Sequence, residues 1–63
     1  MNIIVNGKRF EFEKEINLSD LLIFLNIDEK KCVIELNKEI IKDYNIKLSN
    51  GDKIEIIRMV GGG

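Results

Sequence analysis

One amphipathic segment, residues 17–26, limits what this chain can fold into more than any other stretch. Asn17 suits a helix N-cap, and Asp20, three residues later, resembles the reciprocal partner of a capping box. One apolar stripe follows at i, i+3, i+4 and i+7, formed by Leu18, Leu21, Leu22 and Leu25. Asn26 suits a left-handed C-cap. The pattern predicts a helix over residues 18–25, and a helix this short persists only when it packs on another layer.

The other apolar segments have the composition and alternation of β-strands. Asn6-Gly7 suits a type I′ turn, so we expect the first 13 residues to form a hairpin. Three further strands are predicted over Cys32–Leu36, Glu39–Ile41 and Lys53–Val60. A sheet of four to five strands with a single helix has one covered face, which is an α+β arrangement.

The uncovered face carries more apolar side chains than a lone domain needs. If Ile3 and Val5 point inward with Ile54 and Ile56, strand alternation turns another set outward, namely Ile4, Val33, Ile57 and Met59. A contiguous apolar patch indicates a docking surface for a partner protein. Scattered apolar surface residues without a function are the alternative interpretation.

Composition excludes several classes of protein. The chain has 63 residues, no histidine and one cysteine, so we expect one domain without a metal site or an internal disulfide. A net charge of −1 argues against nucleic acid as a partner. No apolar run approaches the roughly 20 residues of a membrane span. The amino terminus lacks the features of a signal peptide, which favours the cytoplasm. We also expect the protein to be monomeric on its own.

Cys32 falls at an inward position of its predicted strand. A buried cysteine behaves as a small apolar side chain, so packing is the favoured interpretation of this residue, against a role in catalysis.

The sequence ends on three glycines, Gly61 to Gly63. Glycine adopts backbone angles closed to other residues, and it is the thinnest chain that can enter a partner's channel. We therefore predict a folded domain over residues 1–60 and a flexible tail over residues 61–63. Ordinary chain ends also tolerate small residues, and a glycine scar would give the same ending.

Taken in order, these motifs resemble the ThiS family of sulfur carriers in thiamin biosynthesis, which has the ubiquitin-like β-grasp fold. The resemblance covers the whole chain. It rests on the Asn6-Gly7 hairpin, the helix start at residues 17–22, the strand and turn at residues 35–37, the turn at residues 50–53 and the Gly62-Gly63 ending.

The resemblance implies a protein-borne carrier that is not itself an enzyme. The Gly63 carboxylate would be adenylated by a ubiquitin-activating-type enzyme, which binds the ATP, so the carrier holds no cofactor. Sulfur from a persulfide donor would convert the carboxylate to a thiocarboxylate, and thiazole synthase would consume it. Gly62 and Gly63 would be the functional pair, and Gly61 would join the four outward residues in partner binding.

Other functions remain open at this point. The small subunit of molybdopterin synthase shares the fold, ending and chemistry but is usually longer, and other sulfur carriers are similar. A β-grasp interaction module with incidental glycines belongs to a different class. A self-contained enzyme is poorly supported, because the chain has no histidine to work near neutral pH.

Overall fold

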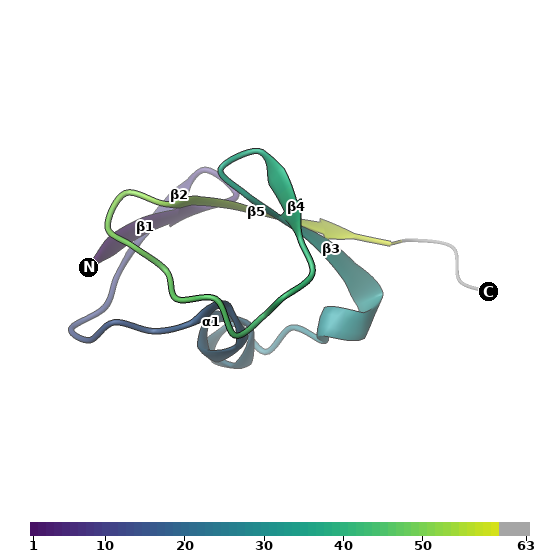
Figure 1. The fold of residues 1–63 in the computed structure, drawn as a ribbon, viewed down its shortest axis with the longest axis horizontal. Coiled ribbons are helices and arrows are strands. Elements are labelled where there is room, and N and C mark those ends of the chain that lie inside the picture. Colours follow the sequence, from purple (N-terminus) through teal and green to yellow (C-terminus); the bar gives the residue numbers. More distant parts are fainter. Residues whose placement is uncertain (60–63) are drawn as a thin grey trace.

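The computed structural model describes residues 1–59, which form one mixed sheet with one α-helix beneath it (Figure 1). The elements are β1 (Asn2–Val5), β2 (Lys8–Glu11), α1 (Leu18–Phe24), the 3₁₀ turn η1 (Glu29–Lys31), β3 (Cys32–Leu36), β4 (Glu39–Ile41) and β5 (Lys53–Arg58). The strand order is β2-β1-β5-β3-β4, with β1 and β5 parallel and the other neighbours antiparallel. The predicted α+β arrangement of four to five strands is confirmed.

The first hairpin forms at the turn that the sequence predicts. Asn6 and Gly7 have φ values of 49° and 81°, which the type I′ turn requires at both positions. Ile3 lies opposite Phe10 in the antiparallel register, so these two residues and Val5 share one face, while Ile4 lies opposite Arg9 on the other. Phe12 follows the strand and is half-buried against the core.

The helix begins at the predicted capping box. The backbone N–H of Asp20 donates to Asn17 Oδ1 at 2.7 Å, and the Asn17 N–H donates to Asp20 Oδ2 at 3.1 Å. At the other end Asn26 has a φ of 58°, and the Ile27 N–H donates to the Leu22 carbonyl at 2.9 Å. Asn26 therefore takes the left-handed conformation expected of asparagine at the position just after the C-cap, Leu25, and α1 ends one residue before the predicted position.

The core lies between α1 and the lower face of the sheet. Its buried residues are Ile3, Val5, Leu18, Leu21, Leu22, Cys32, Ile34, Leu36, Leu48, Ile54 and Ile56. The predicted inward set on β1 and β5 is therefore confirmed. The opposite face of the sheet has no layer over it among the described residues (Figure 1), and no helix of residues 1–59 is long and apolar enough to cross a membrane.

The last strand differs from its prediction at one end. β5 ends at Arg58, and Met59 follows it outside the strand. Residue 60, where the predicted strand and the predicted domain both end, lies outside the described residues, as does the predicted tail over residues 61–63.

Candidate functional site

The last strand, β5, runs through the middle of the sheet and carries the chain toward its predicted reactive end. Side chains fix the start of this strand, since Asn37 Oδ1 accepts from the Lys53 N–H at 2.9 Å and Asn37 Nδ2 donates to Asp52 Oδ1 at 3.0 Å. Just past its other end, the Met59 N–H donates to the Lys31 carbonyl at 3.0 Å. The backbone is therefore hydrogen-bonded to the fold at both ends of β5.

The predicted reactive residues follow directly. Gly62 and Gly63, predicted to carry the chemistry, and Gly61, predicted to contact partners, all lie outside the described residues. The strand that leads to them, β5, terminates at the end of the sheet where β3 begins. This follows from the β3–β5 register, in which Arg58 lies opposite Cys32.

The structure brings the predicted docking residues together only in part. Val33 and Ile57 are direct cross-strand partners, Val33 half-buried and Ile57 47% exposed. Met59 lies two residues farther along and is 61% exposed. Ile4 shares their face of the sheet but lies opposite Lys53. It is therefore offset from Ile57 by four residues along β5, or about 13 Å. The expectation that Ile4 lies beside the other three is wrong, because β1 pairs only with the beginning of β5.

Sequence reasoning missed one exposed residue of this surface. Ile40 of β4 is 62% exposed and lies opposite Glu35, so it shares the face of Val33. The sequence alone does not fix which of the adjacent Ile40 and Ile41 faces outward. The register does, because Ile41 lies opposite the buried Ile34 and Ile40 is therefore turned outward.

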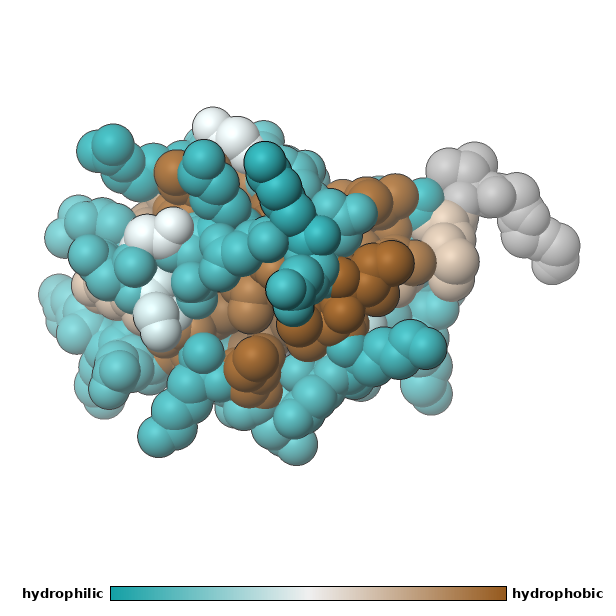
Figure 2. Space-filling view, turned by 45° about the horizontal axis from the view of Figure 1, so that its top comes forward, coloured by the Kyte–Doolittle hydropathy of each residue, from teal (hydrophilic) through white to brown (hydrophobic). Residues whose placement is uncertain are grey.

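We call these four residues the open-face patch: Val33, Ile40, Ile57 and Met59. Figure 2 shows apolar surface gathered toward the end of the molecule where the described chain stops, with hydrophilic side chains around it. An apolar surface next to the last described residue suits a partner that must also hold the residues that follow.

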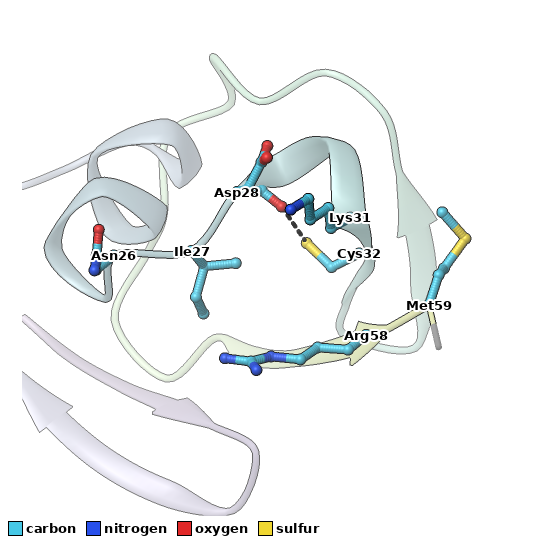
Figure 3. Close-up of a pocket in the computed structure, with 7 residues that line it drawn as sticks. All are labelled: Asn26, Ile27, Asp28, Lys31, Cys32, Arg58 and Met59. Atoms are coloured by element: carbon cyan, nitrogen blue, oxygen red, sulfur yellow. Dashed lines mark hydrogen bonds between the residues drawn. The ribbon is translucent and has the colours of Figure 1, made fainter. Parts of the chain in front are cut away.

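A cleft of about 270 Å³ lies beside the same strand end, between the end of α1 and η1 (Figure 3). Its lining residues are Asn26, Ile27, Asp28, Lys31, Cys32, Arg58 and Met59. The Cys32 thiol donates to the Asp28 carbonyl, with Sγ 3.6 Å from the oxygen. The side chain is only 5% exposed, so the predicted inward position of Cys32 is confirmed.

The surroundings of Cys32 make it a weak nucleophile. Burial raises the pKa of its thiol above the ordinary value of 9.0, and the charges of Asp28 and Glu29 raise it further, against a smaller lowering by Arg58. Since the thiolate is the reactive form, a raised pKa disfavours thiol chemistry at neutral pH. The cleft offers packing and polar contacts around a protonated thiol.

A second apolar group lies on the helix side of the molecule. Phe24 is 61% exposed, yet its ring packs edge-on against Phe12 at 5.1 Å and against Phe10 at 6.3 Å between centroids. Ile23 beside it is 74% exposed. These aromatic contacts tie α1 to the region of β2, so part of this surface already has a structural role.

Known proteins resemble this chain along its whole length. The model of the ThiS family matches residues 3–63. The sulfur carrier protein ThiS of Bacillus subtilis is 36% identical over 63 residues, which cover 94% of this chain and 96% of that protein. A thiazole synthase of Paramagnetospirillum magneticum is 32% identical over all of this chain, which spans only 20% of that protein's length.

Two solved structures share the fold. The thiamine biosynthesis protein ThiS from Geobacter metallireducens superposes with a TM-score of 0.82 at 29% identity, and each chain is covered completely. A chain in the complex of subunits 1 and 2 of the molybdopterin-converting factor from Helicobacter pylori gives 0.68 at 29% identity, again with full coverage of both. The predicted ubiquitin-like β-grasp fold is confirmed by the first of these matches.

Proposed function

The chain belongs to the ThiS family of sulfur carriers, and from that premise we propose that its Gly63 carboxylate is the group that carries sulfur. The observation that carries this proposal is the extent of the family match, which runs through the glycines to residue 63. The reactive group is then the carboxylate at the end of the chain, and the folded residues serve to present it.

Activation of the carboxylate comes first, because a carboxylate repels nucleophiles. A partner enzyme of the ubiquitin-activating type joins the Gly63 carboxylate oxygen to the α-phosphate of ATP and releases pyrophosphate. The product is a mixed anhydride with AMP as the leaving group. ATP binds to the partner, and the carrier is a co-substrate.

Sulfur then replaces AMP. The terminal sulfur of a persulfide donor attacks the carbonyl carbon, the bond to the AMP oxygen breaks, and an acyl disulfide forms. A second thiol attacks the donor's sulfur and takes it as a disulfide, which leaves the thiocarboxylate on Gly63. This soft nucleophile is the form in which sulfur is passed on.

The role of residues 1–59 in this proposal is to position the C-terminal glycines. The hydrogen bonds of Met59 and of the turn before β5 hold the strand on which the tail is mounted. The open-face patch docks against the adenylating enzyme and the acceptor, so that Gly61 to Gly63 enter the partner's channel. Apolar anchors at the centre of an interface give most of the binding energy, and this patch supplies four of them.

Thiazole formation is the acceptor pathway that we favour. A thiazole synthase contains a region similar to this whole chain, and the ThiS structure superposes better than the molybdopterin-converting factor does. The second candidate is therefore a carrier for molybdopterin synthesis, which the 0.68 superposition supports.

Intact mass measurement tests the proposal. The chain is incubated with ATP, the adenylating enzyme of the same organism and a persulfide donor, and one terminal oxygen is expected to be replaced by sulfur. A variant lacking Gly62 and Gly63 serves as the control and is expected to melt normally while accepting no sulfur. Transfer of sulfur to that variant would contradict the proposal. Addition of thiazole synthase or of molybdopterin synthase's large subunit then shows which acceptor consumes the product.

A further inference from the structure

Two carboxylates face each other on the open face of the sheet. Glu35 of β3 and Glu55 of β5 are direct partners in the antiparallel register. Directly opposed residues have their Cβ atoms about 4.5–5.5 Å apart, and like charges in such a pair destabilise the sheet. Glu35 is half-buried and Glu55 is exposed. The fold therefore maintains a repulsive pair at the centre of its uncovered face.

Apolar side chains border this pair. On the side toward the end of β5, the next outward pair in the register is Val33 with Ile57. Across β4, Ile40 lies opposite Glu35. Two carboxylates bordered by apolar groups are shielded from water and from salt when a partner covers them, so their charge acts more strongly there than on a free surface.

Lys53 is one cation on the same face as the two carboxylates. Lys53 is the outward residue before Glu55 on β5, about 7 Å away along the strand, and its register partner is Ile4 on β1. On the β3 and β4 side the outward neighbours of Glu35 are the apolar Val33 and Ile40. One external cation placed above the pair would contact both carboxylates.

We propose that the open face binds a protein segment that places one lysine or arginine over Glu35 and Glu55, with apolar side chains on either side of it. Arginine suits the geometry best, because its planar fork can donate to two carboxylates at once. The apolar neighbours of the cation cover the Val33–Ile57 pair and Ile40. The inference rests on the proposed function in one respect only: the segment belongs to the adenylating enzyme.

Stability provides the first test and needs no partner. Glu55→Gln and Glu35→Gln each remove the repulsion without changing the shape of the side chain. We expect either variant to melt about 1–8 °C above the wild type, from the usual strength of cross-strand pairs and the size of the domain. Glu39→Gln is the matched control on β4, and its melting temperature should stay near that of the wild type. If the melting temperatures of Glu35→Gln and Glu55→Gln both equal that of the wild type, the premise that the carboxylates repel each other is overturned.

Binding provides the second test: the substitution that is expected to raise the melting temperature is expected to lower the affinity. Affinity for the adenylating enzyme of the same organism is measured by calorimetry at two salt concentrations. Because a hydrogen bond to a charged group is strong, Glu55→Gln should bind about tenfold more weakly or worse, and should lose part of the salt dependence. A variant that is more stable and yet binds with unchanged affinity would overturn the proposal.

A peptide probe separates this inference from the proposed function. Acetyl-Leu-Arg-Leu amide is titrated into the ¹⁵N-labelled chain, with acetyl-Leu-Gln-Leu amide as the control. The arginine peptide should shift the amide resonances of Val33, Glu35, Glu55 and Ile57, and Glu55→Gln should weaken that response. If the adenylating enzyme does not bind the wild type but the peptide does, the proposed function fails and the inference stands. Equal shifts with both peptides would overturn the inference. So would a dimer in sedimentation whose interface is the open face, because a second copy of the chain would then be its occupant.

Discussion

The side-chain amide of Asn6 pairs with the backbone of Ile56, 50 residues away in the sequence. Oδ1 accepts from the Ile56 N–H at 2.7 Å, and Nδ2 donates to the Ile56 carbonyl at 3.3 Å. The backbone N–H of Asn6 still donates to the Ile54 carbonyl, and the chain then turns away at Gly7. The side chain thus continues the pairing of β1 along β5 after the β1 backbone has left the sheet.

This contact predicts that Asn6 stabilises β5, the strand that leads to the predicted reactive end. Asn6→Gly keeps the positive φ of 49° available but removes both side-chain hydrogen bonds. We expect a loss of about 1–3 kcal/mol, because the Ile56 groups lose their partners. Asn6→Ala should cost more, since alanine also resists the left-handed conformation. A thermal melt of Asn6→Gly that matches the wild type would show that the pairing contributes nothing.

Leu21 should carry a large share of the core energy. It is fully buried in α1, and Leu21→Ala is expected to destabilise the fold by about 2–5 kcal/mol through lost burial and the cavity left behind. Ile23→Ala on the exposed side of the same helix is the matched control, with an expected change within about 0.5 kcal/mol. Chemical denaturation measures both. Equal losses for the two variants would contradict the packing of α1 on the sheet.

Ile57 should matter for docking more than for folding. It is 47% exposed on the open face, so Ile57→Ala should leave the melt nearly unchanged. Truncation of a central anchor typically costs about 2 kcal/mol in binding, or roughly 30-fold in affinity for the adenylating enzyme. Ile4→Ala is the comparison within the same face, and its smaller effect would reflect its distance from the open-face patch. Unchanged affinity for Ile57→Ala would make the patch ordinary surface.

Cys32 should contribute a pH-dependent share of stability. Burial, then Asp28 and Glu29, raise the pKa of its thiol above the ordinary 9.0 of the unfolded chain. The stabilisation is fully present below pH 9.0 and is lost as the pH rises through the higher folded-state pKa, because the unfolded chain releases the proton first. The difference in unfolding free energy between the wild type and Cys32→Ala should therefore narrow above pH 9.0 in denaturant titrations.

The same Cys32→Ala variant tests the role of the thiol. A packing residue can be replaced with some loss of stability while sulfur transfer to Gly63 continues. Intact mass after incubation with the partner enzymes measures that transfer. A well-folded Cys32→Ala protein that no longer accepts sulfur would show that the thiol takes part in the chemistry.

The length of the tail should be as important as its glycines. One residue added after Gly63 moves the carboxylate by roughly 3.3–3.6 Å. A displacement of about 1 Å can already cost 100-fold in rate. We therefore expect the extended chain to fold normally and to form no adenylate, which is measured by ATP–pyrophosphate exchange. Normal exchange with the extended chain would mean that the reacting group lies elsewhere.

Local patterns in the sequence were sufficient to predict the helix and the strands of the fold, but not the 3₁₀ turn η1. The Asn6-Gly7 turn and the Asn17 capping box each depend on residues within a few positions of one another, and both appear in the structure as predicted. Strand alternation likewise predicted which side of β1 and β5 is buried, because successive side chains must point to opposite faces.

The candidate site could be predicted only as a face of the sheet. Alternation turned Ile4, Val33 and Ile57 outward together, but it carries no information about where one strand lies along another. Register between distant strands is set by tertiary packing, and it placed Ile4 opposite Lys53, away from Ile57. It also made Glu55 the partner of Glu35.

The sequence by itself therefore determined the elements, the inward and outward sides of the strands and the family. Only the tertiary structure decided which outward residues meet, because the alignment of β5 with β1 and β3 depends on packing the whole core at once. The pairing of Asn6 with Ile56 depends on that alignment, as does the opposition of Glu35 and Glu55. Neither contact follows from a local pattern, since each joins residues at least 20 positions apart in the chain.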